Sequence, residues 1–264
     1  MLSSLVVLSA VTSVAMGAFD DNIARNIMMP MSGAAYSDSP ARCVNAKLPG
    51  GKMTKQVTLN CDYFSDKCSG FTFIDDSKKI IGLAFRGSSN VAQLVAEASK
   101  YFYDAFTKLW NGGLKAEFTS LAKAHPTYTA YITGHSLGGA IASMAADIIG
   151  HDGIHPANKI LLYTFGQPRT GDQDYANSHD KNQPNSFRVT HSRDIVPHIP
   201  FQWMGYFHHS HEVFYDNDMS KPTFVDCKGQ EDHSCSGSHI DLSIDDHLHY
   251  YGVSVSGYGN NGCA

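Results

Sequence analysis

The architecture of this chain is organised around the stretch TGHSLGGA, residues 133–140. It contains the Gly-x-Ser-x-Gly pattern of a nucleophile elbow, in which a serine sits on a tight turn between a strand and a helix. The preceding residues 128–132 are β-rich, and residues 140–149 have a helical pattern that ends at Gly150. The competing interpretation is an ordinary glycine-rich turn before a helix.

The elbow interpretation explains why the residues on either side of the serine are small. Gly134 and Gly138 leave room where a Cβ would collide with the neighbouring strand or helix. Ser136 then lies at a helix N-terminus, where backbone N–H groups and the helix dipole stabilise negative charge. We therefore treat Ser136 as the candidate nucleophile.

Length and charge limit the classes of protein to consider. The chain has 264 residues, with no internal repeat, charge block or low-complexity linker, which favours a single α/β domain. The net charge of −5 gives no electrostatic basis for binding nucleic acid and disfavours adsorption to anionic membranes by charge alone.

Hydrophobic patterns predict alternating strands and helices. The near-continuous apolar run at residues 159–165 is typical of a strand buried on both faces of a parallel sheet. We expect further strands at 57–59, 70–74, 79–85, 128–132, 186–190, 211–215 and 223–225. We expect helices at 20–36, broken or ended near Pro30, at 102–124, interrupted at 111–113, and at 244–251, with a surface loop at 37–55 around Cys43.

The first 17 residues have the form of a secretory signal peptide, with an apolar run at 5–15 and a cleavage site before Ala18. The run is too short to span a bilayer, so no transmembrane segment is expected. The segment before the run lacks Lys and Arg, and the competing interpretation is a buried N-terminal helix.

Six cysteines lie outside this leader, and their even number favours disulfides in an oxidising compartment. Spacing alone leaves the pairing open. A zinc site is the competing interpretation, but no CxxC pair is present. There is also no Asn-x-Ser/Thr sequon for N-glycosylation.

A serine nucleophile needs a histidine base, which a carboxylate orients, and in this fold class the acid and then the histidine follow the serine along the chain. Asp194 comes just after the strand that ends at Thr190 and has apolar neighbours. Rival acids lie in a polar stretch at Asp172, Asp174 and Asp180. Spacing does not single out the base among His247, His249, His208, His209, His211, His233 and His239.

Four further segments occur in register with the elbow: FRGSS at 85–89, YTFGQPRTGD at 163–172, HSRDIVPHIP at 191–200 and DHLHYYG at 246–252. Together with GHSLGGA, they make the chain from about Tyr36 to Cys263 resemble the class 3 lipases, the family of the fungal-type triacylglycerol lipases. The resemblance implies an α/β-hydrolase fold, with a central, mostly parallel sheet flanked by helices.

The resemblance also assigns roles. It implies that Ser136 is the nucleophile, Asp194 the orienting acid and His247 the general base. The backbone N–H groups of Ser88 and Leu137 become the oxyanion hole, with the Ser88 hydroxyl as a helper. The implied reaction is two-step acyl transfer, which requires no metal or organic cofactor. The implied disulfides are Cys43–Cys263, Cys61–Cys68 and Cys227–Cys235.

The favoured function is therefore a secreted, extracellular triacylglycerol lipase acting on an ester or lipid substrate. A short-chain, feruloyl-type or phospholipid esterase of the same fold stays open, and the sequence does not give the oligomeric state. The alternative from another class is a non-catalytic lipid-binding protein on a lipase scaffold.

The aromatic stretch 201–207 is a departure from the family pattern. It is interpreted either as an acyl pocket or lipid contact, or as ordinary core packing. His208, His209 and His211 follow it, but no matching metal ligand is placed by spacing.

A second departure predicts how the activity responds to lipid surfaces. The family's lid helix corresponds here to residues 90–100, a shorter stretch without the lid tryptophan, where apolar residues recur at helical spacing. It is either a short lid or an ordinary core helix. A small lid covers little apolar surface, so we expect weak interfacial activation. Hydrolysis of a short-chain ester measured across its solubility limit checks this, and a sharp jump at saturation would contradict it.

Overall fold

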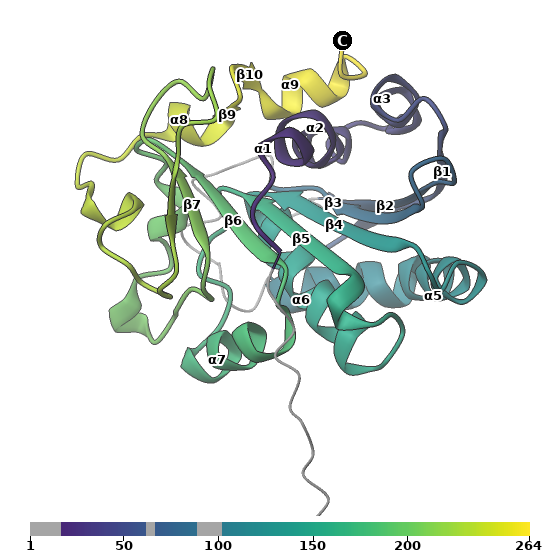
Figure 1. Cartoon of the computed structure of the whole chain (residues 1–264), viewed down its shortest axis with the longest axis horizontal. Coiled ribbons are helices and arrows are strands. Elements are labelled where there is room, and N and C mark those ends of the chain that lie inside the picture. Colours follow the sequence, from purple (N-terminus) through teal and green to yellow (C-terminus); the bar gives the residue numbers. More distant parts are fainter. Residues whose placement is uncertain (1–16, 62–66, 89–101) are drawn as a thin grey trace, which may run out of the picture.

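A twisted eight-stranded sheet, with its strands in sequence order, runs through the part of the chain that the structure describes (Figure 1). The structure is a computed structural model, and it describes residues 17–61, 67–88 and 102–264. The predicted leader, apart from Gly17, and the predicted lid stretch at 90–100 lie outside these residues. The strands are β1 (Gly51–Asn60), β2 (Lys67–Asp75), β3 (Ile80–Phe85), β4 (Thr129–His135), β5 (Ile160–Phe165), β6 (Ser186–His191), β7 (Glu212–Tyr215) and β8 (Val225–Cys227).

The sheet is parallel in its centre and antiparallel at its edges. Strands β3 to β7 pair in parallel, whereas β1, β2 and β8 pair in antiparallel fashion. The central strands are buried on both faces, as the continuous apolar run of β5 predicts. The predicted fold class, an α/β-hydrolase fold with a mostly parallel sheet, is confirmed.

Helices cover both faces of the sheet and enclose one hydrophobic core on each side (Figure 1). One layer contains α1 (Asp21–Ile23), a π-helical turn (Ala24–Met28), α2 (Met29–Ala34), α3 (Ala41–Lys47) and α9 (Val255–Asn260). The other contains a helix at 102–109, a second π-helical turn (Trp110–Leu114), α5 (Lys115–Ala124), α6 (Leu137–His151) and α7 (Gln173–Asn182).

Short elements complete the chain. One 3₁₀ turn, Ala157–Lys159, precedes β5. Beyond β6 lie the 3₁₀ turns Val196–His198, Gln202–Met204 and Ser236–Ser238, the helix α8 (Ile244–Leu248), and the strands β9 (His249–Tyr250) and β10 (Val253–Ser254). Among the described residues, no helix combines the length and apolar character needed to cross a membrane.

The prediction of a surface loop at 37–55 was wrong. This segment forms α3 and the beginning of β1, which is ten residues long rather than three. The pattern was misleading because β1 is an edge strand with mostly exposed polar side chains, and these read as loop. Helix α3 is anchored by Cys43 and Val44, which are buried against the core.

Three further points add to the expectations. The polar stretch containing Asp172 leads into α7, whose first turn Asp172 caps by accepting a hydrogen bond from the Tyr175 N–H at 2.9 Å. The N-terminal helix continues past Pro30, because the proline falls in the first turn of α2. Helix α9 was not predicted at all, since its sequence VSGYGN carries two glycines.

Three disulfides join Cys43 to Cys263, Cys61 to Cys68 and Cys227 to Cys235. This is the pairing that the family resemblance implies. The first bridge ties α3 to the C-terminal segment across a sequence separation of 220 residues, whereas the third closes a separation of only 8 residues.

These separations predict unequal contributions to stability. In the chain-entropy treatment, a bridge across such a long loop contributes about 5 kcal/mol and one across a very short loop about 2.5 kcal/mol. We therefore expect the double variant Cys43→Ser/Cys263→Ser to lose more free energy of unfolding than Cys227→Ser/Cys235→Ser. Denaturant unfolding of both variants measures the difference, and an equal loss would contradict this account.

Candidate active site

The elbow holds Ser136 in a strained conformation between β4 and α6. Its φ of 61° and ψ of −133° place a non-glycine residue where L side chains rarely occur. The neighbouring glycines make this turn sterically feasible. A Cβ added at Gly134 would lie 2.1 Å from the Gly138 carbonyl oxygen, and one at Gly138 would lie 2.3 Å from that of Phe85.

Asp194 lies at the carboxyl end of β6, where its carboxylate is almost completely buried at 1 % exposure. It accepts hydrogen bonds from the Val196 N–H at 2.8 Å and the Tyr250 hydroxyl at 2.7 Å. Its two oxygens lie 2.9 and 3.0 Å from Nδ1 of His247. The structure therefore brings Asp194 and His247 together across 53 residues of sequence.

His247 is fully buried in α8, and its Nε2 atom has no hydrogen-bond partner among the described residues. The same holds for the Oγ atom of Ser136. The ring of His135, the residue before Ser136, stacks on the His247 ring with 4.5 Å between the centroids. Ser136 therefore lies at the same end of the sheet as the Asp194–His247 pair.

The surroundings of Asp194 favour its ionised form. Burial raises the pKa of this carboxyl group, but the charge and hydrogen bond of His247, with the hydrogen bonds from Tyr250 and Val196, hold it below its usual value. Tyr250 was missed by the sequence reasoning, although it lies in the DHLHYYG segment. Its hydroxyl stays protonated, because burial and the Asp194 charge raise its pKa well above the usual value.

His135 forms a second polar link that the sequence did not indicate. Its Nε2 lies 2.8 Å from the His247 carbonyl oxygen, which only accepts, so Nε2 carries the proton. Nδ1 is then the acceptor, and the Tyr36 hydroxyl donates to it at 2.8 Å. Burial and the nearby His247 lower the pKa of His135 to about 3, so the ring is neutral at physiological pH.

The two candidate oxyanion-hole residues flank the elbow. Leu137 is the first residue of α6, so its N–H has no acceptor within the helix. Ser88 is half-buried and follows Gly87, where an added Cβ would lie 3.0 Å from Cβ of Ser136. Ser88 and His247 line a cavity of about 220 Å³, together with Tyr36, Arg86 and Leu248 among others.

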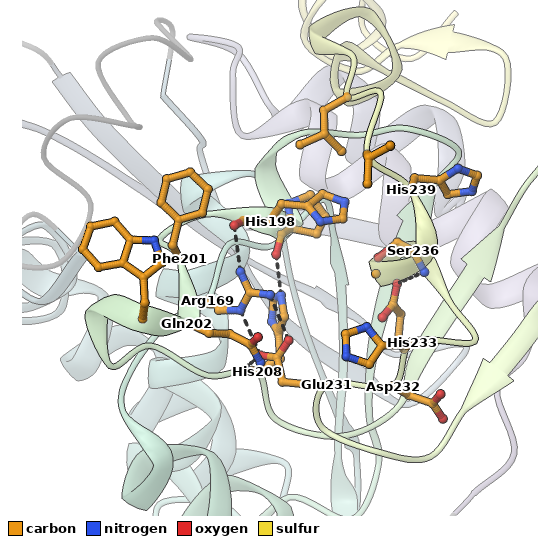
Figure 2. Close-up of a pocket in the computed structure, with 16 residues that line it drawn as sticks. Arg169, His198, Phe201, Gln202, His208, Glu231, Asp232, His233, Ser236 and His239 are labelled. Atoms are coloured by element: carbon orange, nitrogen blue, oxygen red, sulfur yellow. Dashed lines mark hydrogen bonds and ion pairs between the residues drawn. The ribbon is translucent and has the colours of Figure 1, made fainter.

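The rival acids and bases lie in other places. Asp180 accepts from the backbone and hydroxyl of Ser210, and Asp174 lies in the first turn of α7. His249 pairs with Asp245 and is partly exposed. His233 and His239 line a separate cavity of about 520 Å³, whose lining does not include Asp194 or His247 (Figure 2).

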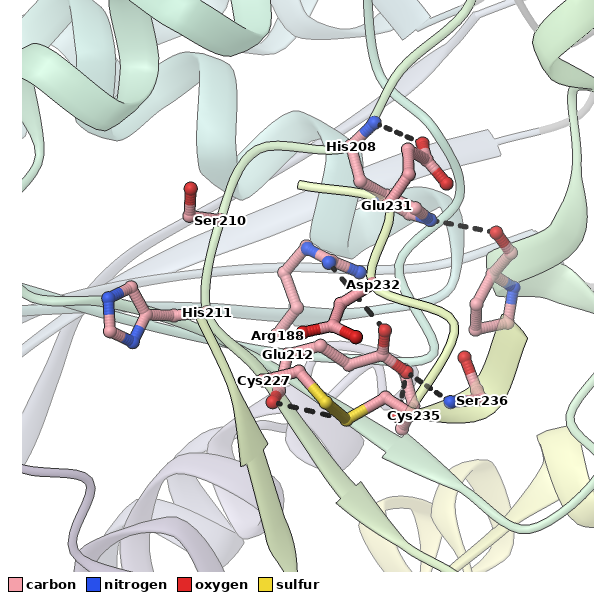
Figure 3. A network of polar contacts seen from close by, with 12 residues as sticks. Arg188, His208, Ser210, His211, Glu212, Cys227, Glu231, Asp232, Cys235 and Ser236 are labelled. Atoms are coloured by element: carbon pink, nitrogen blue, oxygen red, sulfur yellow. Dashed lines mark hydrogen bonds and ion pairs between the residues drawn. A yellow bond between two sulfur atoms is a disulfide. The ribbon is translucent and has the colours of Figure 1, made fainter. Parts of the chain in front are cut away.

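The histidines after the aromatic stretch belong to a buried polar network (Figure 3). His208 donates through Nε2 to the Pro197 carbonyl oxygen at 2.7 Å and through its backbone N–H to Glu231. Arg188 lies 3.8 Å from Glu212, which also accepts from the Ser236 N–H. His209 stacks on His179, and His211 faces Asp226. The contacts of His208 with Glu231 and of Glu212 with Ser236 hold the 227–236 segment against the sheet.

The interpretation of residues 201–207 as core packing was wrong for the first half of the stretch. Phe201, Trp203 and Met204 are exposed, with Trp203 at 82 %, and only Tyr206 and Phe207 are half-buried. The Phe201 and Trp203 rings stack on each other at 5.9 Å between centroids. Both line the larger cavity.

Comparisons with known families and proteins agree with this geometry. The profile of the family described as Lipase (class 3) matches residues 84–204. A lipase of Caenorhabditis elegans is 30 % identical over 288 aligned positions, covering 90 % of this chain and 81 % of its own length. A lipase of Rhizomucor miehei is 32 % identical, covering 68 % of this chain and 54 % of its own length.

Solved structures of lipases are similar in fold to this chain. The lipase of Rhizopus microsporus var. chinensis matches with a TM-score of 0.79 at 26 % identity, covering 91 % of each chain. A triacylglycerol lipase whose catalytic centre is described as a serine protease triad matches with a TM-score of 0.77 at 26 % identity, covering 90 % of this chain and 97 % of its own.

The neutral His135 predicts a loss of stability in acid. The unfolded chain takes up a proton at His135 near the usual pKa of 6.5, whereas the folded chain does so only near 3. The lowered pKa of His135 therefore adds to the free energy of unfolding above pH 6.5. Below pH 6.5 this stabilisation is lost by about 1.4 kcal/mol per pH unit. We expect His135→Gln to show a shallower fall in the free energy of unfolding between pH 7 and 5. Equal slopes in both proteins would contradict this.

Proposed function

The chain belongs to the class 3 lipase family and is a carboxylic-ester hydrolase, and we propose that it cleaves acylglycerol esters through an acyl-enzyme formed on Ser136. The observation that carries this proposal is the buried Asp194–His247 pair beside the strained elbow serine. The Oγ of Ser136 and the Nε2 of His247 are buried and make no hydrogen bond within the described ranges, so both are free to react.

In the proposed mechanism, Nε2 of His247 takes the Ser136 proton as Oγ attacks the ester carbonyl carbon. Asp194 accepts the hydrogen bond from Nδ1–H, which fixes the tautomer and stabilises the imidazolium. His247 then gives its proton to the leaving alcohol. Water, activated by the same imidazole, attacks the acyl-enzyme and releases the acid, so the protein returns to its starting state.

The negative charge on the tetrahedral intermediate needs donors that are already in place. We assign this role to the backbone N–H groups of Leu137 and Ser88, with the Ser88 hydroxyl as a helper. The position of Leu137 at the N-terminus of α6 supports the assignment, because the helix dipole adds to the effect. One such donor contributes about 3 kcal/mol to transition-state stabilisation.

The names of the relatives support acylglycerols as the substrate class. They include a triacylglycerol lipase and the secreted mono- and diacylglycerol lipases of Fusarium solani and Penicillium camembertii. This chain spans just over half the length of the Fusarium solani and Rhizomucor miehei relatives, at 58 % and 54 %. Secretion is supported by the three disulfides and by the printed names of these relatives.

A test of this proposal compares wild type with Ser136→Ala. We expect wild type to hydrolyse p-nitrophenyl esters and emulsified glycerides and to react covalently with a fluorophosphonate probe. Ser136→Ala should lose the labelling and at least about 10⁴-fold in kcat. Asp194→Asn should retain the fold and lose about 10⁴-fold, because the imidazole then takes the wrong tautomer.

Circular dichroism of each variant serves as the control for folding. Hydrolysis by Ser136→Ala at the wild-type rate would overturn the assignment of the nucleophile. A folded wild type that binds glyceride but neither hydrolyses it nor reacts with the probe would favour a non-catalytic lipid-binding protein.

A further inference from the structure

The cavity of about 520 Å³ has no part in the mechanism proposed for Ser136. It is lined by two segments, 197–203 and 231–242, together with Arg169, His208 and Glu212. Its volume is in the range of small-molecule binding sites. Figure 2 shows Phe201 and His239 on opposite sides of it, so an apolar side and a polar side face each other.

The polar side of the cavity contains two buried histidine nitrogens without a hydrogen-bond partner. His208 is only 4 % exposed, and its Nε2 donates to the Pro197 carbonyl oxygen at 2.7 Å. Its Nδ1 is therefore an acceptor, and no described residue donates to it. The Nε2 of His198 is also buried and without a partner among the described residues. Buried polar atoms are normally hydrogen-bonded, so these two point to an occupant with hydrogen-bonding groups.

Both histidines are uncharged at physiological pH. Burial, with the positive charges of Arg188 and Arg169, holds the pKa of His208 well below its usual value. Burial and Arg169 lower the pKa of His198 in the same way. The polar side therefore presents neutral imidazoles, which bind O–H or N–H groups without adding a charge.

The deeper carboxylates of the cavity already have cationic partners. Arg169 donates to both oxygens of Glu231, at 2.9 Å each. Glu212 accepts from the Ser236 N–H at 3.1 Å, and the Arg188 guanidinium lies 3.8 Å from it. A charged ligand would lose its hydration here without meeting an uncompensated opposite charge, which is unfavourable. These ion pairs therefore favour a neutral ligand.

The other carboxylate of the lining, Asp232, does not change this balance. Its Oδ1 accepts hydrogen bonds from the N–H and the hydroxyl of Ser234, at 2.9 and 2.6 Å, and both bonds lie at the exposed surface. Water and salt screen a charge in such a position, so it contributes little to ligand selection.

Aromatic and aliphatic side chains form the apolar side. The Phe201 and Trp203 rings stack with 5.9 Å between their centroids, and both line the cavity with Ile240 and Leu242. Trp203 is 82 % exposed, so most of its surface is open to a ligand. Sugar rings have an apolar C–H face that packs on aromatic rings, and hydroxyl groups around the edge that reach polar groups. The two sides of this cavity match these two features.

We propose that this cavity binds a neutral sugar. Its hydroxyl groups bond to Nδ1 of His208 and Nε2 of His198, and its C–H face packs against Phe201 and Trp203. A hydroxyl both donates and accepts, whereas an ammonium only donates and a carboxylate only accepts. The sugar is either free in solution or the head group of a glycosylated lipid, because both present the same ring. This binding goes beyond ester hydrolysis and is measured without any ester.

A series of sugars that differ only in charge tests the proposal. The probes are methyl glucoside and methyl galactoside, each compared with its amino-sugar and uronate analogues, and the wild-type protein is titrated by calorimetry. We expect a dissociation constant of about 1 mM for the better neutral sugar, and binding at least about tenfold weaker for its charged analogues. Emission of Trp203 should change on binding, since Trp110 is only 4 % exposed.

Matched variants assign the binding to this cavity. Trp203→Ala removes part of the apolar side, and His198→Leu removes the unpartnered nitrogen but keeps a side chain of similar size. Each should weaken binding of the neutral sugar by about tenfold. Tyr103→Ala removes an aromatic residue that is 62 % exposed and does not line the cavity, so binding should stay unchanged. Thermal melts followed by circular dichroism check that each variant is folded.

Hydrolysis assays distinguish the two sources of the sugar. If the neutral methyl hexoside inhibits hydrolysis of galactosyl diacylglycerol but not of a soluble p-nitrophenyl ester, the cavity takes a lipid head group. If it binds but inhibits neither reaction, the cavity takes a free sugar.

Three results would overturn the sugar site. They are no binding of either neutral hexoside at about 50 mM, tighter binding of an amino sugar or uronate, and binding that Trp203→Ala and His198→Leu leave intact. The first result would mean that water alone fills the cavity. None of them affects the proposed function, which instead fails if wild type does not hydrolyse the p-nitrophenyl ester.

Discussion

The arrangement around Ser136 depends on one buried charge, the carboxylate of Asp194. A carboxylate out of contact with water is tolerated only when hydrogen bonds or an opposite charge replace its hydration. Here the replacements come from the Val196 backbone and from His247 and Tyr250, which lie more than 50 residues further along the chain. The charge therefore requires the C-terminal segment to fold back against the end of β6, and that segment carries the proposed base.

The nucleophile side of the site depends on sterics rather than charge. The positive φ of Ser136 stores backbone strain, which the close packing of β3, β4 and α6 compensates. The stiff sheet fixes the serine, and the stacked His135 ring then connects it to His247 through the carbonyl oxygen of that residue. Two independent constraints, backbone strain and carboxylate burial, thus converge on the same end of the sheet.

The sequence predicted those parts of the fold whose patterns are local. The elbow, the apolar β5 and the helix interrupted near Gly113 follow from glycine chemistry and hydrophobic period, and the structure contains them. Prediction from the sequence failed where tertiary contacts determine the secondary structure. Strand β1 looks polar because it is an edge, and α9 forms despite two glycines because it packs against α2.

The same distinction applies to the site. Chain order suggested an acid followed by a late histidine, but spacing did not choose His247 over His249, and only the family resemblance did. Tyr250, His135 and Tyr36 escaped notice because their contacts join segments far apart in the sequence. Their polar atoms touch groups 56, 112 and 99 residues away, respectively, and no local pattern encodes such partners.

The C-terminal segment shows how these constraints reinforce each other. It contributes His247 and Tyr250 to the buried carboxylate and accepts a hydrogen bond from His135, and its last helix packs on α2. None of these contacts is local, so each requires closing a long loop, and the entropy of that closure is large. The Cys43–Cys263 bridge ties the end of this segment to α3. A buried charge that needs distant partners is thereby combined with a covalent link that keeps those partners near.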